Sequence, residues 1–416
     1  PSLLIFSHNY AESVRTIKDR VLSIKMFWQI GKSDECEFEG YEGKFSKNFI
    51  GPLDCKIDSD SCFAIFYTSG TTGLPKGAMV SHTNLEMNSY NQIIADAASS
   101  EDINLISSPL YHMGAVFMAV TYMMLGCSQY ILHKFSAEEW LASMARSKAT
   151  VALLIPTMIN SIVTNQNLNE NTLSNLRLIF YGGGPMPPTV LRKAIDFLKC
   201  DFTQGYGLTE TLEATFLLAS DHVLDGDATV RKRLGSAGRE AVGAELKIIN
   251  ENGKELMTGE VGEILIRSKS VISGYWDMPE ETSRVISDGW FYTGDLGYLD
   301  DDRYLFVVDR KKDMVISGGV NIYTREIESR LYQHQDIIEA AVVGLPDESW
   351  GEIVTAIVVA KSGSKIDETV VIDFCGETLA SFKKPKKVIF RDELPKNPSG
   401  KILKKDLRLS LTNLNS

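Results

Sequence analysis

Strand-like and helix-like stretches alternate through the middle of this chain, and the alternation limits the fold more than any other feature. Short apolar runs at Gln129 to Leu132, Val151 to Ile155 and Leu178 to Tyr181 are typical of buried strands. They alternate with helical stretches at Ala137 to Ser147 and Pro188 to Leu198. This order predicts an α/β domain with a mainly parallel sheet. Ligands of such sheets bind at the carboxyl ends of the strands.

A glycine- and hydroxyl-rich loop follows another apolar run. Cys62 to Tyr67 is predicted to be a buried strand that leads into the loop Thr68 to Gly77, which reads Thr-Ser-Gly-Thr-Thr-Gly-Leu-Pro-Lys-Gly. Its glycines let backbone N–H groups turn toward an anion, and Lys76 adds a positive charge. The lysine precedes its glycine and no hydroxyl follows directly, so the loop is not a Walker A motif. The composition predicts a phosphate site, although by itself it also fits a flexible surface loop.

Size, charge and cysteine usage limit the class of protein. A chain of 416 residues is expected to form two or more domains. Its formal charge of −11 argues against broad, nonspecific binding of nucleic acid. The most apolar run, Met113 to Leu125, is shorter than the roughly 20 residues that span a bilayer, so we expect it in the core. Six scattered cysteines suggest neither a zinc site nor a disulfide framework and fit a reducing, cytoplasmic setting.

Four further motifs follow the loop along the chain. They are Gln204 to Thr211 (Gln-Gly-Tyr-Gly-Leu-Thr-Glu-Thr), Tyr292 to Gly297 (Tyr-Thr-Gly-Asp-Leu-Gly), Asp309 to Glu328, and Pro395 to Ile402 (Pro-Lys-Asn-Pro-Ser-Gly-Lys-Ile). Together the five motifs resemble, in order, those of the adenylate-forming superfamily, which includes acyl-CoA synthetases, aryl-CoA ligases, peptide-synthetase adenylation domains and luciferases. The resemblance covers the chain after about residue 60 and favours the acyl-CoA synthetase branch.

The resemblance implies a large α/β domain followed by a small mobile α+β cap. We expect an adenylation domain at residues 1–309, with a β-rich subdomain from Gly235 onward, a hinge at residues 310–312 and a C-terminal domain at residues 313–416. Family members carry another lobe before the glycine-rich loop, so the first lobe is expected to be missing here. The chain departs from the family at Gly184, usually alanine, at Glu240, often proline, and at Thr324, usually proline. We expect the departure at Thr324 to have structural consequences only.

The implied activity is that of an AMP-forming acid–thiol ligase. Such an enzyme uses ATP and Mg²⁺ to convert a carboxylic acid, here a fatty or aryl acid, into an acyl adenylate. It then forms a thioester with coenzyme A and releases AMP and pyrophosphate. Its partners would be small molecules, with no nucleic acid and no integral membrane segment. Oligomeric state is left open.

Three alternatives remain. The chain could load a carrier protein, adenylate an amino acid, or be a non-enzymatic nucleotide-binding homologue. No aspartate begins the segment 112–116 to hold an ammonium group, which disfavours amino acids. Lys401 and Glu210 are both present, which disfavours an inactive homologue.

The resemblance also assigns site residues. Lys401 would bridge carboxylate and α-phosphate, Glu210 and Thr68 would hold Mg²⁺, and His112 would lie beside the substrate carboxylate, although a lone histidine also fits a structural role. Lys134 and the basic run Phe382 to Lys387 would meet phosphates of coenzyme A, although such a run also fits a solvated face. The residues implied to bind ATP or coenzyme A are Ser69, Gly70, Thr71, Thr72, Lys76, Lys134, Gly183, Gln204, Gly205, Tyr206, Thr209, Asp295, Arg310, Lys312, Gly318, Gly319 and Asn321.

Overall fold

A computed structural model describes residues 2–31, 38–44, 56–68, 75–165, 173–184, 186–396 and 402–412. The chain divides into two compact units, residues 1–57 and 58–416. The first unit holds a parallel sheet and one helix around the small apolar cluster of Phe6, Val14 and Phe38. Its elements are β1 (Leu3–Ser7), α1 (Ala11–Lys18), β2 (Met26–Ile30) and β3 (Glu39–Gly40).

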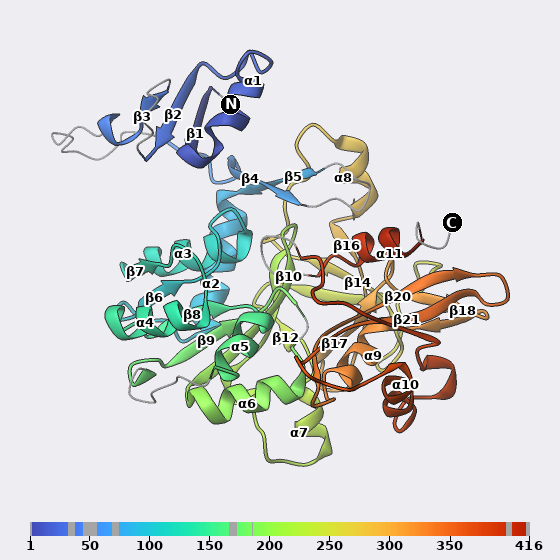
Figure 1. The fold of residues 1–416 in the computed structure, drawn as a ribbon. Coiled ribbons are helices and arrows are strands. Elements are labelled where there is room, and N and C mark those ends of the chain that lie inside the picture. Colours follow the sequence, from blue (N-terminus) through green and yellow to red (C-terminus); the bar gives the residue numbers. More distant parts are fainter. Residues whose placement is uncertain are drawn as a thin grey trace. The chain divides into compact units, whose positions relative to one another are not determined.

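A seven-stranded sheet forms the centre of the second unit (Figure 1). Its strands are β6 (Ile103–Ile106), β7 (Ser128–Ile131), β8 (Val151–Leu154), β9 (Leu178–Tyr181), β10 (Asp201–Leu208), β11 (Leu212–Leu217) and β12 (Arg239–Glu240), in the spatial order β12-β11-β10-β9-β8-β6-β7. From β7 to β10 all pairs are parallel, whereas β11 and β12 are antiparallel. The predicted α/β fold is therefore confirmed. The apolar run Leu105 to Leu110 has the pattern of a strand, but β6 ends at Ile106; Pro109 has no N–H for a sheet and begins a turn.

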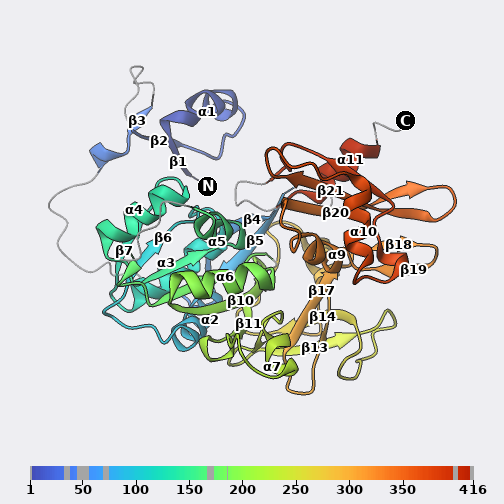
Figure 2. The same ribbon diagram turned by 60° about the horizontal axis from the view of Figure 1, so that its bottom comes forward.

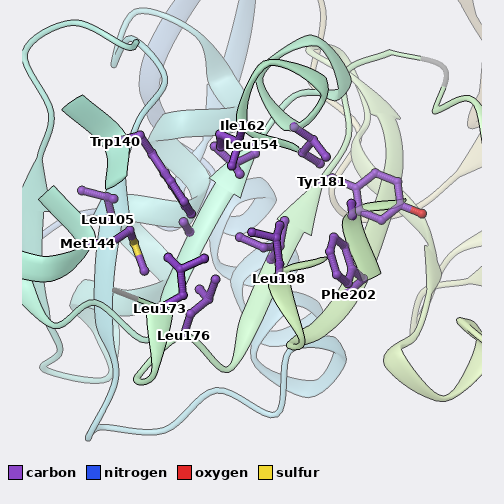
Figure 3. Close-up of a cluster of buried hydrophobic side chains, with 14 of the residues drawn as sticks. Leu105, Trp140, Met144, Leu154, Ile162, Leu173, Leu176, Tyr181, Leu198 and Phe202 are labelled. Carbon is purple, nitrogen blue, oxygen red and sulfur yellow. The ribbon is translucent and has the colours of Figure 1, made fainter. Parts of the chain in front are cut away.

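Helices cover both faces of this sheet. They are α2 (His82–Ala95), α3 (Met113–Met124), α4 (Ala137–Ser147), α5 (Pro156–Val163) and α6 (Pro188–Leu198). Helices α4 to α6 pack on Leu154, Tyr181 and other residues of one face, as Figure 3 shows, whereas α2 and α3 pack on Leu153 and Phe180 of the other. Neighbouring strand residues point to opposite faces, so both sides of the sheet are buried.

Local sequence explains several helix boundaries. Ser81 accepts a hydrogen bond from the backbone N–H of Asn84 and caps α2. The apolar run from Met113 forms α3, and its buried residues, such as Phe117 and Tyr122, lie in the core as predicted, whereas Met123 and Met124 at its end are exposed. Within the described part of the chain, no helix is long and apolar enough to cross a membrane.

A second, five-stranded sheet confirms the expected β-rich region. It contains β13 (Glu245–Ile249), β14 (Gly262–Arg267), β15 (Ile286–Ser287), β16 (Trp290–Leu299) and β17 (Leu305–Arg310), accompanied by α7 (Ala228–Arg233) and α8 (Pro279–Val285). The pattern around Tyr292 is typical of a strand that ends at Asp295, but Asp295 lies inside β16. The strand continues past this residue because β14 and β17 pair with it on both sides.

The C-terminal residues build a separate core. They form β18 (Val315–Ser317), β19 (Val320–Ile322), α9 (Thr324–Leu331), β20 (Ile337–Asp347), β21 (Gly351–Ala360), α10 (Glu368–Gly376), β22 (Lys387–Phe390) and α11 (Lys404–Thr412). Two hydrophobic clusters are drawn wholly from residues 315–411. Figure 1 shows these elements in orange and red. A self-contained core of this kind fits the domain boundary that we predict near residue 312.

A two-stranded ribbon lies apart from both large sheets. It pairs β4 (Cys62–Thr68) with β5 (Lys76–Ser81) in antiparallel register. The prediction of a strand before the glycine-rich loop is confirmed, but its predicted burial is wrong, since Phe63 and Tyr67 are 42% and 69% exposed. Among the described residues β4 pairs only with β5.

Candidate active site

The carboxylate of Asp295 joins two motifs that are far apart in sequence. Tyr206 on β10 donates a hydrogen bond of 3.0 Å to Asp295 Oδ2, and Arg310 Nε lies 3.1 Å from Asp295 Oδ1. The register of β16 and β17 sets Asp295 opposite Arg310. Burial, followed by the charge of Asp295, raises the pKa of Tyr206 well above its usual value, so the phenol stays a donor. Two predicted nucleotide-binding residues, Tyr206 and Arg310, thus contact a third, Asp295.

A second group gathers around Glu210, in the turn between β10 and β11. The phenol of Tyr275 donates a hydrogen bond of 2.8 Å to Glu210 Oε1. The ammonium of Lys76 lies 5.2 Å from the centre of the Tyr275 ring and pairs with Glu281. Backbone hydrogen bonds from Met79 to Gly274 and from Trp276 to Gly77 hold β5 against this segment. The end of the glycine-rich loop is therefore tied to the glutamate predicted to bind metal.

Close backbone packing brings the segment Gly182–Gly184 to β10. Tyr181 and Gln204 are partners in the parallel pair of β9 and β10. A Cβ on Gly182 would lie 2.8 Å from the carbonyl oxygen of Gly205, and Gly183 has a φ of +75°. Both positions therefore require glycine. The structure thus brings Gly183 next to the Gln204–Thr209 motif.

His112 lies at the N-terminus of α3. Its side chain does not cap the helix, and its buried Nε2 has no hydrogen-bond partner among the described residues. Burial lowers the pKa of His112 below its usual value, so the ring is neutral at neutral pH. A neutral imidazole with a free polar atom is able to bind a ligand.

A cavity of about 500 Å³ opens at the carboxyl ends of β6, β7 and β8. Its wall is mainly apolar, and Lys134 supplies a positive charge. The lining residues are Ser107, Pro109, Tyr111, Leu132, His133, Lys134, Phe135, Ile155, Thr157 and Met158. The position is the one expected for a ligand site in a parallel sheet.

The predicted hinge and glycine pair lie beyond β17. Burial, then the charge of Arg310, lowers the pKa of Lys312, and Lys405 of α11 adds to the effect. Gly318 and Gly319 have φ values of +58° and +79°, and a Cβ on Gly318 would lie 2.8 Å from Trp350 Cε3. Asn321 is exposed in β19.

Several predicted residues lie elsewhere or outside the description. Thr68 ends β4 and donates a long hydrogen bond of 3.5 Å to the carbonyl of Lys76, while Thr209 lies in the turn beside Glu210. Ser69, Gly70, Thr71, Thr72 and Lys401 lie outside the described residues.

Sequence reasoning missed Tyr275 and Glu281. Both reach the site through contacts with residues 65 and 205 positions away in the chain, and neither belongs to a recognisable motif. Within the described ranges, no group of three or more His, Cys, Asp or Glu residues is arranged to hold a metal.

Two family models match the chain. The model described as AMP-binding enzyme matches residues 1–276, and the model described as AMP-binding enzyme C-terminal domain matches residues 326–401. Feruloyl-CoA synthase from Amycolatopsis sp is 37% identical over 358 residues, which cover 86% of this chain and 71% of that protein. The fatty acid–[acyl-carrier-protein] ligase ScoC from Streptomyces coeruleorubidus is 37% identical over 368 residues, covering 86% and 69%.

Solved structures give the same picture. ATP-bound MatB from Rhodopseudomonas palustris matches with a TM-score of 0.87 at 33% identity, covering all of this chain and 80% of MatB. The apo structure of MatB matches over the same shares of both chains with a TM-score of 0.73.

Proposed function

The chain belongs to the family of AMP-binding enzymes, and from this membership we infer that it is an AMP-forming acid–thiol ligase. The enzyme uses ATP to convert a carboxylic acid into an acyl adenylate. It then transfers the acyl group to the thiol of coenzyme A and releases AMP. The observation that carries this proposal is the contact of Tyr206 and Arg310 with the single carboxylate of Asp295.

Asp295 suits the ribose of the nucleotide. The two oxygens of a carboxylate accept hydrogen bonds from the two neighbouring hydroxyls of a ribose. In our proposal Tyr206 fixes the carboxylate and lies against the adenine, with Gly183, Gln204 and Gly205 along the base. Arg310 contacts the ribose or a phosphate, and Thr209 contacts a phosphate. Gln204, Gly205 and Tyr206 lie on β10 beside the end of β9, and Asp295 pairs with Arg310 across β16 and β17, which supports this grouping.

Adenylation joins two anions. An oxygen of the substrate carboxylate attacks the α-phosphorus of ATP, a new P–O bond forms, and the bond to pyrophosphate breaks. Positioning and neutralisation of charge supply most of the catalysis of such transfers. In our proposal Lys401 neutralises the carboxylate and the α-phosphate. Ser69, Gly70, Thr71, Thr72 and Lys76 bind the departing pyrophosphate.

Glu210 fits a magnesium ion that arrives with the nucleotide. One carboxylate oxygen of Glu210 accepts the hydrogen bond of Tyr275, which orients the group. Mg²⁺ is commonly held by one or two carboxylates together with phosphate oxygens and water, so a cluster of protein ligands is not needed. Thr68 would supply a hydroxyl. When bound, the ion neutralises negative charge on the phosphates.

The cavity beside Lys134 suits the acyl group or the thin arm of coenzyme A. Its mainly apolar lining favours a fatty or aryl acid over a small charged acid. His112 would meet the substrate carboxylate, and Lys134 a phosphate of coenzyme A. In the second step the thiol sulfur attacks the acyl carbonyl, the C–S bond forms, and the bond to AMP breaks. Gly318 and Gly319 would let the arm pass close to the backbone, and Asn321 lies on the neighbouring strand.

A carrier protein is the second candidate for the acyl acceptor. ScoC, whose printed name gives an acyl-carrier-protein as acceptor, is as similar to this chain as feruloyl-CoA synthase is. The basic residues at Lys383 to Lys387 would suit either the phosphates of coenzyme A or an acidic carrier surface. A competition between coenzyme A and a carrier protein bearing phosphopantetheine distinguishes the two acceptors. We further propose a cytoplasmic location, which the buried thiol of Cys375 fits.

A pyrophosphate-release assay tests the proposal. The purified chain is incubated with ATP, Mg²⁺ and a panel of fatty and aryl acids, with and without coenzyme A. We expect acid-dependent release of pyrophosphate, and formation of a thioester and AMP only when coenzyme A is present. Absence of release with every acid would contradict adenylation. Release without any thioester would favour the carrier protein as acceptor.

A further inference from the structure

Thr324 joins the strand before the hinge to the first turn of α9. Its backbone N–H and its hydroxyl both donate to Asp309 Oδ2, the hydroxyl at 2.9 Å. The other oxygen of Asp309 accepts the backbone N–H of Arg310 at 2.7 Å. Asp309 is 1% exposed and Thr324 is fully buried. A buried carboxylate is thus held by three hydrogen bonds, two of them from one residue.

The same hydroxyl extends the network to α11. Lys404 Nζ donates to Thr324 Oγ1 at 2.7 Å and lies 2.7 Å from Glu328 Oε1. Glu328 in turn accepts the backbone N–H of Val342 on β20 at 2.8 Å. The hydroxyl of Thr324 therefore lies between two charged groups. It donates a hydrogen bond to Asp309 and accepts one from Lys404. Networks of this kind in a buried setting hold one arrangement strongly, since each broken link leaves an unpaired group.

This network is a main contact between the two sides of the hinge. Each hydrophobic cluster of the described residues lies wholly before or wholly after residue 312. Helix α9 lies beside β17 (Figure 2), and Arg325 adds a hydrogen bond of 3.3 Å to the carbonyl of Val307. The interface next to the hinge is therefore polar. Polar contacts can be exchanged for water when the domains turn, so this interface can open.

The first turn of α11 acts electrostatically on the hinge. The positive charge of Lys405 contributes to lowering the pKa of Lys312. Lys401 precedes α11 by three positions in the sequence. These observations favour the orientation of the C-terminal domain that serves adenylation.

We propose that Thr324 is a positioning residue, a latch that holds the C-terminal domain in the adenylating orientation by linking Asp309 to Lys404. The proposal rests on the two-step function proposed above. It goes beyond the expectation that the departure from proline at this position has structural consequences only, and the variants below decide between the two. Proline has no N–H and no hydroxyl, so it can form neither hydrogen bond to Asp309 nor accept one from Lys404.

A graded series of variants separates the two donors. Thr324→Ser keeps the N–H and the hydroxyl, Thr324→Val keeps only the N–H, and Thr324→Pro keeps neither. Thr355→Val is the matched control, because the buried hydroxyl of Thr355 in the same domain has no hydrogen-bond partner among the described residues. Single-turnover assays measure adenylate formation from ATP and acid, and thioester formation from a supplied acyl adenylate. Thermal melting checks the fold of each variant.

We expect the ratio of adenylation rate to thioester rate to fall roughly tenfold or more in Thr324→Val and further in Thr324→Pro, as for loss of a hydrogen bond to a charged group. Thr324→Ser and Thr355→Val should keep the ratio of the wild-type chain. Equal losses in both half-reactions, or no change in the ratio, would overturn the latch.

Cleavage by trypsin at Lys311 and Lys312, followed by mass spectrometry, gives a readout that does not need activity. Opening of the latch should raise the rate of this cleavage in Thr324→Val and Thr324→Pro, and leave it unchanged in Thr324→Ser. If the wild-type chain adenylates no acid, the proposed function fails, but the cleavage rates still test the latch. Unchanged cleavage in the Val and Pro variants would contradict it.

Discussion

Tyr206 donates a hydrogen bond of 3.0 Å to Asp295 across 89 positions of sequence and thereby connects the seven-stranded sheet to the five-stranded sheet. The donor lies on β10 and the acceptor inside β16. The bond fixes where the Asp295 carboxylate points. If Asp295 binds ribose, loss of this one hydrogen bond should weaken nucleotide binding more than it lowers the stability of the fold.

The variant Tyr206→Phe tests this relationship. It removes the hydroxyl but keeps the ring, so we expect the KM for ATP to rise roughly tenfold, with a loss of stability of about 1 kcal/mol. Tyr298→Phe, on the same strand as Asp295, is the control and should leave the KM unchanged. Steady-state kinetics at varied ATP give the answer. An unchanged KM for Tyr206→Phe would contradict the proposal that Asp295, as oriented by Tyr206, binds the nucleotide.

Glu210→Gln should weaken the use of Mg²⁺-ATP without unfolding the chain. The amide oxygen of glutamine still accepts the hydrogen bond of Tyr275, but the negative charge that attracts the cation is gone. We expect the Mg²⁺ concentration for half-maximal activity to rise, while the melting temperature stays close to that of the wild type. A collapse of melting temperature with unchanged Mg²⁺ dependence would instead mean that Glu210 is structural.

Lys401→Ala should abolish adenylate formation and spare thioester formation from a supplied acyl adenylate. Only the first step brings two anions together and needs the ammonium to neutralise them. Single-turnover assays of each half-reaction measure the split. Equal loss of both steps would contradict a specific role of Lys401 in adenylate formation.

Lys312→Pro should restrict the hinge. Proline holds φ near −65° and also limits the conformation of Lys311 before it, so the segment can no longer take up two orientations. If the orientation described here is retained, acyl adenylate still forms while thioester formation falls by orders of magnitude. Rapid-quench measurements of both steps check this. Retention of both rates would show that the domains do not pivot at Lys312.

The raised pKa of Glu213 predicts that the stability of the fold depends on pH. Burial raises the pKa of Glu213 on β11 to about 8, with a further contribution from the charge of Asp96. The neutral form therefore favours the folded state. That stability is fully present below the usual pKa of a glutamate and is lost as pH rises toward 8.

Glu213→Gln keeps a neutral side chain of the same shape at every pH. We expect it to melt close to the wild type at pH 5 and several degrees higher at pH 9, since the wild type must then either bury a charged carboxylate or take up a proton on folding. Differential scanning calorimetry at both pH values measures the difference. Equal melting temperatures at pH 9 would contradict a buried neutral Glu213.

Much of the fold follows from local sequence pattern. The runs at Leu178 to Tyr181 and Pro188 to Leu198 form a strand and a helix with the predicted boundaries. Alternate residues of β9 pack against helices on opposite faces, as a parallel sheet buried on both sides requires. The exposure of β4 was not predictable, because apolar pattern shows which residues favour burial but not which neighbours are present to bury them.

The sequence predicts which residues belong to the candidate site, but it does not predict how they contact one another. Motifs name Tyr206, Asp295 and Glu210, yet no local pattern shows that Tyr206 bonds to Asp295 or that Tyr275 bonds to Glu210. These contacts arise from strand pairing and packing between distant segments. Thr324 gives the clearest case. The sequence marks it as unusual, and only the structure shows the charges that it connects.

The ribbon of β4 and β5 has an unpaired strand edge among the described residues, which favours self-association in solution. Strand β5 is bounded by β4 on one side and by residues 274–276 on the other, whereas the far edge of β4 pairs with no other described strand. Its unpaired backbone groups lie next to the exposed rings of Phe63 and Tyr67. Such an edge is a template for pairing with another molecule. Self-association should therefore increase with protein concentration, and a lysine in place of Phe63 should suppress it.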